Sequence, residues 1–324
     1  MRRRYLCGAL VGVIATAGAL TTSAAARRVS SQAAHAKVSA MRPVDFRPVQ
    51  HAKPARPTRT NNLSYHGGVG GIGVETAPKL FLVLWGSQWN NNDPSGEESL
   101  LASFFGKAGG SSWLASVTQY CEGVASGTVF CNGGEPAGDG VSFSSSNSVW
   151  YDNASAAPSS PSQSQLAAEA VRAAQHFGNT ANGSNDTTQY VVATATHNSA
   201  SGFGTQYCAW HSSTSSSYGN IAYTNLPYIT DAGASCGANF NNLGPKAGIT
   251  IVEGHEMAET ITDQYPNGGW LDKNGEENGD KCAWITSGQG ASASVPLNGT
   301  NFPVQSLWSN VFNSDKGGCV LSYP

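Results

Sequence analysis

The amino-acid sequence predicts an α+β domain, with a central mixed sheet, flanking helices and long loops, stabilised by disulfide bonds. Three observations lead to this prediction. A continuous apolar run at residues 79–85 is typical of a buried strand. The segment 163–177 is rich in strong helix formers and follows a Ser-Pro start signal. Six cysteines lie beyond the N-terminal leader, an even number that suits disulfide pairing.

The N-terminus has the organisation of an export signal. Three arginines follow Met1, an apolar stretch runs from Leu6 to Leu20, and a run of small residues ends at Ala26. This order predicts a signal peptide over residues 1–26. The apolar stretch is short, and no other segment has the length to cross a bilayer, so we expect a secreted, extracellular protein with no membrane span in the mature chain.

Charge divides the rest of the chain into two parts. Residues 27–62 hold eight Lys or Arg, one acid and several prolines, which predicts a flexible linker or propeptide. Residues 63–324 hold seven basic and 20 acidic side chains and have the length of a single secreted domain. An acidic body repels phosphates, so we expect no nucleic acid partner.

The cysteines indicate an oxidising compartment. Cys7 lies within the signal peptide, which leaves an even set in the mature chain. Six cysteines allow many pairings, and we favour pairing in sequence order. No C-x-x-C spacing supports a zinc-thiolate site. The expected bridges are Cys121 with Cys131, Cys208 with Cys236, and Cys282 with Cys319.

Further elements follow from local patterns. Helices are expected at about 96–107 and 112–120, a Gly- and Cys-rich hairpin region around 128–131, and a strand at 189–195. Ser, Gly and Asn dominate residues 198–220 and 286–300, which predicts long loops there. A last helix is expected from about Lys246 to Asp263.

This last helix carries most of the chemistry. At about 100° per residue, His255, Glu256, Glu259 and Asp263 fall within one arc, beside an apolar arc that faces the core. No Lys or Arg occurs between Lys246 and residue 273 to neutralise these acids. A bound cation would neutralise them.

The string His255-Glu256-x-x-Glu259 resembles the H-E-x-x-H helix of zinc peptidases, with Glu as the second ligand, so we expect a zincin-like active-site helix. His255 and Glu259 would bind one divalent metal, and Glu256 would be the general base. Glu276, Glu277 and Asp280 are available as the third ligand, and we favour Glu277. Asp280 would then orient His255, and Asp263 would also support the ligands without binding the metal.

Other interpretations of the same residues remain open. An acidic helix face exposed to solvent would need no metal. One imidazole with several carboxylates suits zinc, with calcium as the alternative ion. His211 is a reserve candidate for substrate contact or metal binding, although a structural role is the simpler interpretation. The string Gly233-x-Ser235-x-Gly237 lacks the strand and helix of a serine hydrolase nucleophile.

In order along the chain, several short motifs together resemble the phosphate-induced protein family, whose plant members are called EXORDIUM-like. They are residues 65–68 (Tyr-His-Gly-Gly), 84–86 (Leu-Trp-Gly), 112–113 (Ser-Trp), 208–211 (Cys-Ala-Trp-His), 226–228 (Leu-Pro-Tyr), 254–259 (Gly-His-Glu-Met-Ala-Glu), 277–282 (Glu-x-x-Asp-x-Cys) and 307–309 (Leu-Trp-Ser). The resemblance covers most of the mature domain. The long basic linker and the fewer cysteines around 208–236 depart from the plant pattern.

This resemblance implies an extracellular or cell-wall-associated protein, with His255, Glu256, Glu259, Glu277 and Asp280 in the family's acidic motif, but it implies no activity. From the residues themselves we expect a secreted metal-dependent hydrolase that acts on peptide bonds through metal-activated water. The alternative is a non-enzymatic EXORDIUM-like protein that binds the cell wall or another partner. In that case the same cluster would be a structural or vestigial metal site.

Overall fold

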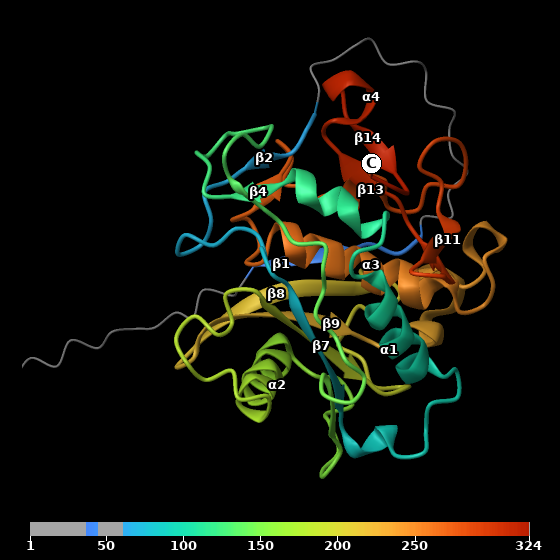
Figure 1. Ribbon diagram of the computed structural model, residues 1–324. Helices are drawn as coiled ribbons and strands as arrows, with labels where there is room; N and C mark the ends of the chain where they lie inside the picture. The colour runs from blue at the N-terminus through green and yellow to red at the C-terminus, as the bar shows by residue number, and fades with distance from the viewer. Residues whose placement is uncertain (1–36, 45–60, 324) are drawn as a thin grey trace, which may run out of the picture. The chain divides into compact units, whose positions relative to one another are not determined.

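The computed structural model describes residues 37–44 and 61–323 (Figure 1). The predicted signal peptide, 1–26, lies outside the described residues, as do 27–36 and 45–60 of the predicted linker. Within the described part, helices and a mixed sheet confirm the predicted α+β class.

A six-stranded sheet forms the centre of the domain. Strands β3, β6, β7 and β9 run parallel to one another, while β8 pairs antiparallel with β9 and β1 pairs antiparallel with β8. The strands in spatial order are β1 (Val38–Met41), β8 (Ala209–Ser216), β9 (Gly219–Leu226), β7 (Thr188–Thr194), β3 (Lys79–Trp85) and β6 (Val149–Asp152).

Helices cover both faces of this sheet, and Figure 1 shows α2 (Gln163–His176) and α3 (Ala247–Thr262) on opposite sides of it. The strands alternate accordingly: Leu82 packs in the core on the α3 side, and Val83 packs in the core on the α2 side. Helix α1 (Glu97–Ala108) packs against α3. Because α3 lies between the sheet and α1, with further contacts to neighbouring segments, every one of its residues is buried.

Short elements complete the domain. They are the strand pairs β2 (Ser64–Tyr65) with β10 (Trp270–Leu271), β4 (Cys121–Glu122) with β5 (Glu135–Pro136), β11 (Ala293–Leu297) with β12 (Thr300–Val304), and β13 (Leu307–Ser309) with β14 (Gly318–Val320), the short helix α4 (Phe312–Asp315), and the 3₁₀ helices η1 (Ser87–Trp89), η2 (Leu114–Gln119), η3 (Ile229–Cys236), η4 (Phe240–Asn242) and η5 (Asp280–Cys282).

Several predicted elements need correction. Residues 38–41, which were assigned to the linker, form strand β1 at the edge of the sheet. The expected loops at 198–220 and 286–300 contain strands β8, β11 and the start of β9, which are ordered by the strands they pair with and not by their own composition. The expected second helix is the shorter 3₁₀ helix η2.

The predicted disulfide pairing is confirmed. Cys121 bonds to Cys131, Cys208 to Cys236, and Cys282 to Cys319. The second bridge ties the start of β8 to the end of η3, beside the first turn of α3. The third ties η5 to β14. Two of the three bridges therefore fix segments that flank α3 or follow it.

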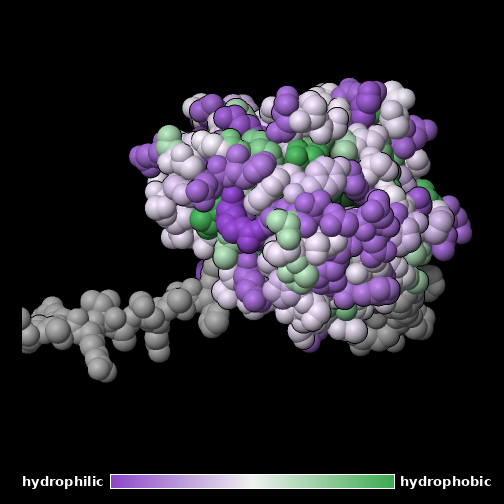
Figure 2. All heavy atoms as spheres, turned by 90° about the horizontal axis from the view of Figure 1, so that it is seen from below, coloured by the Kyte–Doolittle hydropathy of each residue, from purple (hydrophilic) through white to green (hydrophobic). Residues whose placement is uncertain are grey.

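The surface of the described part of the chain offers little contiguous apolar area. Large apolar side chains that are exposed are scattered over separate elements: Val38, Val69, Phe130, Tyr151 and Val311. The face in Figure 2 is mostly hydrophilic, with apolar residues in small separate patches. Among the described helices, none combines the length and apolar composition needed to cross a membrane.

Candidate metal centre

The site begins with two side chains on α3. His255 and Glu259 are one helical turn apart, a spacing that places both on the same face. His255 Nε2 lies 3.1 Å from Glu259 Oε1, and both side chains are completely buried. Glu256, the next residue in the chain, is also buried. The predicted ligand pair and the predicted base thus share the middle of one buried helix.

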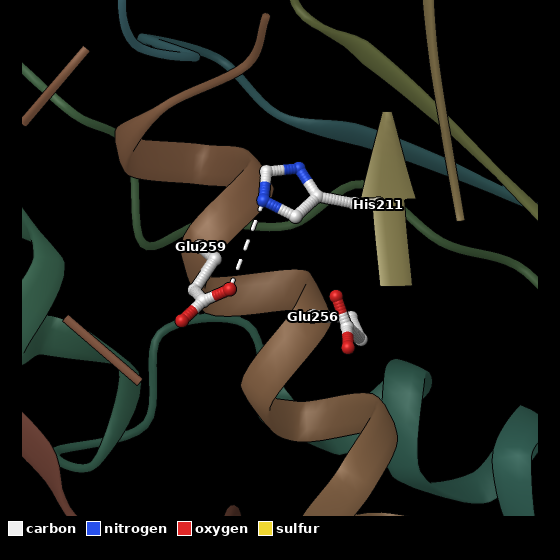
Figure 3. A group of neighbouring side chains, drawn as sticks. All are labelled: His211, Glu256 and Glu259. Atoms are coloured by element: carbon white, nitrogen blue, oxygen red, sulfur yellow. Dashed lines mark ion pairs between the residues drawn. The ribbon is translucent and has the colours of Figure 1, made fainter. Parts of the chain in front are cut away.

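Strand β8 contributes a second histidine. His211 Nε2 is 3.7 Å from Glu259 Oε2, and Figure 3 shows this ring extending from β8 towards α3. The same nitrogen is 3.1 Å from Glu277 Oε2. Its neighbour Trp210 packs in the core on the other face of the sheet, as strand alternation requires. The reserve candidate His211 is therefore a full member of the site.

The segment after β10 supplies two more carboxylates. Asp280 Oδ1 is 3.9 Å from His255 Nε2, and the Asp280 backbone N–H donates to Glu259 Oε1 at 2.8 Å. Glu277 lies beside His211 instead. Asp280, with a side chain about one quarter exposed at 24%, is the member nearest to solvent. We call these residues the acid–histidine cluster: His211, His255, Glu256, Glu259, Glu277 and Asp280.

Gln305, just after β12, fixes the orientation of His255. Its amide oxygen is 3.3 Å from His255 Nδ1, and its amide nitrogen donates to the Gly279 carbonyl at 2.8 Å. With the amide group held by Gly279, Oε1 accepts the proton of Nδ1 and leaves Nε2 as the unprotonated nitrogen. Nε2 faces Glu259, as a metal-binding imidazole requires.

Strand β1 closes the cluster on another side. The Ser39 hydroxyl donates a hydrogen bond to Glu277 Oε2, and the backbone N–H of Met41 donates to Glu256 Oε1 at 3.3 Å. Both contacts come from a segment that the sequence analysis placed in the linker. Neither residue carried a sequence signal, and the same is true of Gln305.

Burial dominates the electrostatics of the cluster. It raises the pKa of Glu256, Glu259 and Glu277 well above the usual range, and neighbouring carboxylates raise these pKa values further. Burial lowers the pKa of His211 to about 4, so this ring is neutral. Among residues 37–44 and 61–323, no Lys or Arg forms an ion pair with the cluster, and Lys281 pairs with Asp272 at 2.9 Å. The cluster therefore holds an excess of buried acid.

The carboxyl groups of Glu259 and Glu277 contact each other. Among the described residues, the buried polar atoms of the cluster that lack hydrogen-bond partners include His255 Nε2 and Glu256 Oε2. Such atoms are costly to bury unless something binds them. Two sets of donor atoms lie close enough together to share an ion, namely His255 with Glu259 and Asp280, and His211 with Glu256 and Glu259. Both sets include Glu259. The atoms present therefore fit a divalent metal.

No protein-family model, curated protein or solved structure matches the chain. The resemblance to the phosphate-induced proteins therefore stays a prediction, and the site is interpreted from its own geometry.

The remaining predicted site residues lie outside the cluster or at its edge. Glu276 is exposed. Asp263 is buried at the edge of the cluster, where its carboxyl group contacts that of Glu277. It also accepts the backbone N–H groups of residues 267, 268 and 269, at 2.6, 2.9 and 2.5 Å, and so fixes the turn after α3. Glu277 is the third ligand expected from the sequence, whereas Asp280 is the carboxylate grouped with His255 and Glu259. Which of the two binds a metal stays a prediction.

Proposed function

We propose that the protein is a secreted metal-dependent hydrolase that cleaves peptide bonds, with its metal in the acid–histidine cluster and Glu256 as general base. One observation carries this proposal: two imidazoles and four carboxylates converge in one site, and no Lys or Arg of residues 37–44 and 61–323 forms an ion pair with them. Perturbed, buried titratable groups of this kind concentrate at functional sites. The three disulfides support secretion, because such bonds persist in oxidising compartments.

The donor set favours zinc over calcium. Imidazole nitrogens suit zinc, whereas calcium takes oxygen ligands almost alone. Donors bound to one zinc at about 2.0 to 2.2 Å lie roughly 3 to 4 Å apart. The 3.1 Å between His255 Nε2 and Glu259 Oε1, and the 3.9 Å between His255 Nε2 and Asp280 Oδ1, agree with that spacing.

The side chains divide the chemistry between them. His255, Glu259 and Asp280 would hold the ion, with Glu277 and His211 adjoining. A bound divalent metal would polarise a substrate carbonyl and make water more acidic. Glu256 Oε2, which has no hydrogen-bond partner, is the atom that would take a proton from water and return it to the leaving amine. Gln305 holds His255 in the tautomer that leaves Nε2 free.

A second function is favoured by the closure of the site. Strand β1 contacts Glu277 and Glu256, and the cluster is almost entirely buried. A structural metal inside a non-enzymatic extracellular or cell-wall-associated protein would sit in such a place. Structural and catalytic metals differ in whether an open ligand position is kept for water.

Two measurements test the proposal. Elemental mass spectrometry of the purified protein should find about one zinc per chain, lost in the double variant His255→Ala, Glu259→Ala. Glu256→Gln should then keep the metal and the fold but lose hydrolysis of a peptide library by at least about a hundredfold. If the protein binds metal but hydrolyses no peptide of the library, the structural alternative is favoured. A folded protein that takes up no divalent metal would overturn both functions.

A further inference from the structure

Strand β1 is an unusual edge strand. It comprises four residues, pairs with β8 alone among the described strands, and belongs to a segment whose charge is opposite to that of the body. Without β1, strand β8 would be the edge of the central sheet, with a free row of backbone hydrogen-bonding groups. An exposed edge of this kind binds extended peptides by adding them as a further strand.

The β8 edge lies directly beside the acid–histidine cluster. In the register of the two strands, Ser39 is opposite His211, a member of the cluster. On this side of β1, the Ser39 hydroxyl contacts Glu277 and the Met41 N–H contacts Glu256 Oε1. A main-chain amide group is thus held next to the proposed base, which is where a peptide substrate would have to lie.

The other side of β1 faces a pocket. Val38 and Ala40 line a hollow of about 560 Å³ together with residues of the α2 side, including Tyr207 and Trp210. Successive side chains of β1 therefore enter two different environments, the cluster and this pocket. Side chains that alternate between separate pockets give specificity when a peptide binds by strand addition.

Residues 37–44 are attached by the side chains of Ser39 and Met41, the latter completely buried in the core, and by a set of backbone hydrogen bonds. The Lys37 carbonyl accepts from Ser212 Oγ at 2.7 Å, the Met41 carbonyl from Cys208 N at 2.8 Å, and the Arg42 carbonyl from Trp284 Nε1 at 2.6 Å. The Val44 N–H donates to the Ser235 carbonyl at 2.8 Å. Backbone attachments of this kind are open to any extended peptide, whatever its sequence.

From these contacts we infer that β1 occupies the binding site of an extended peptide substrate, and that residues 37–44 block the chain's own site until they are displaced. That the bound peptide is a substrate rests on the proposed function. That an extended peptide binds in the place of β1 does not depend on catalysis. The ligand class is a peptide in extended form, paired antiparallel with β8, with a small side chain at the place of Ala40.

The binding test uses the full chain with a specific protease recognition sequence introduced within residues 45–60 and cut after purification. A fluorescent peptide of residues 37–44 is added in excess, and anisotropy reports its binding. We expect saturable binding to the cut chain and none to the uncut chain. A matched peptide with an N-methyl group at the place of Met41, which cannot donate to Glu256, should bind at least about tenfold more weakly.

Several outcomes would overturn the inference. The cut chain could remain folded and fail to bind the peptide, it could unfold when the N-terminal fragment leaves, or the two peptides could bind equally. The cleaved N-terminal fragment could also stay bound for a day in a hundredfold excess of peptide. That result would show that β1 is not displaced. Peptide binding without any hydrolysis would remove the hydrolase proposal and leave the binding strand intact.

Native-state hydrogen exchange on the uncut chain gives an independent readout. The Met41 amide should exchange through a local opening at least about a hundredfold faster than the buried amides of β7, such as Val191. If both exchange only with global unfolding, β1 is an integral strand and the inference is wrong.

Discussion

Gly279 lies so close to His255 that a β-carbon on Gly279 would be 2.7 Å from His255 Nδ1 and 2.9 Å from Glu259 Oε1. Gly279→Ala should therefore displace buried side chains that have no room to move, at a cost of about 1 to 3 kcal/mol, and should weaken metal binding. Urea unfolding and metal titration would measure both effects. Gly106→Ala is the matched control: it lies on the exposed side of α1 with no atom near its β-carbon, and should stabilise slightly. If the two variants had the same stability and the same metal affinity, the close packing of Gly279 against His255 would be refuted.

Gln305→Leu should reduce metal affinity without preventing folding. The substitution removes the acceptor for His255 Nδ1 and leaves the histidine free to place its proton on Nε2. Loss of such an orienting partner typically lowers metal affinity by about 10- to 100-fold. Competition with a chromophoric chelator would measure the change. Gln289→Leu, where the amide donates to the Cys319 carbonyl at 3.2 Å, is the control and should keep the native affinity. Unchanged affinity in Gln305→Leu would show that Gln305 does not position the ligand.

How much of this site the sequence could predict depends on how far apart its parts lie. Helix α3 was predictable because His255, Glu256 and Glu259 belong to one periodic segment. Glu277 and Asp280 are near in sequence, so they were found, but the choice between them depends on how η5 turns. His211 was named only as a reserve, because its distance from Glu259 is set by sheet pairing across the domain.

The missed strands have a different cause. Strand β8 ends in a run of Ser and Thr that has no apolar alternation, and β1 lies between basic and Pro-rich stretches. Each is ordered by the neighbour it pairs with and not by its own composition. Strand β3, buried on both faces, needs no such partner information, since its apolar run is sufficient.

Glu75 should make stability depend on pH, through a site away from the cluster. It is completely buried, bonds Gln189 Nε2 at 2.7 Å, and burial raises its pKa to about 8. The folded state therefore keeps on Glu75 a proton that the unfolded state releases near pH 4.5. The contribution of this proton to the stability of the fold is full below pH 4.5 and is lost as the pH rises through 8. Stability should fall by up to about 1.4 kcal/mol per pH unit in this window.

Glu75→Gln should remove this slope. Guanidinium unfolding of wild type and variant at pH 5 and pH 8 would show similar stability at the lower pH and a more stable variant at the higher pH. Glu135→Gln, at an exposed position, is the control, and its unfolding free energy should change between the two pH values by the same amount as that of the wild type. Parallel wild-type and Glu75→Gln curves would mean that Glu75 titrates normally.

The Cys208–Cys236 bridge should matter more than the Cys121–Cys131 bridge. Their sequence separations are 28 and 10 residues, and the longer loop constrains the unfolded chain more. Replacing both cysteines of the longer loop by alanine should cost about 3 to 4 kcal/mol, and those of the shorter loop about 1 kcal/mol less. Thermal unfolding followed by circular dichroism would compare them. A larger loss from the shorter loop would show that native-state strain decides the order.

Ser39 and Glu277 are in contact although 238 positions separate them in the chain. Strand β1 is therefore synthesised long before the residues that it contacts. It can dock only after β8 has joined the sheet and the segment beyond α3 has folded back. Until that last step the cluster is open to the surrounding solution, so the proposed metal would be taken up before the strand closes over the site.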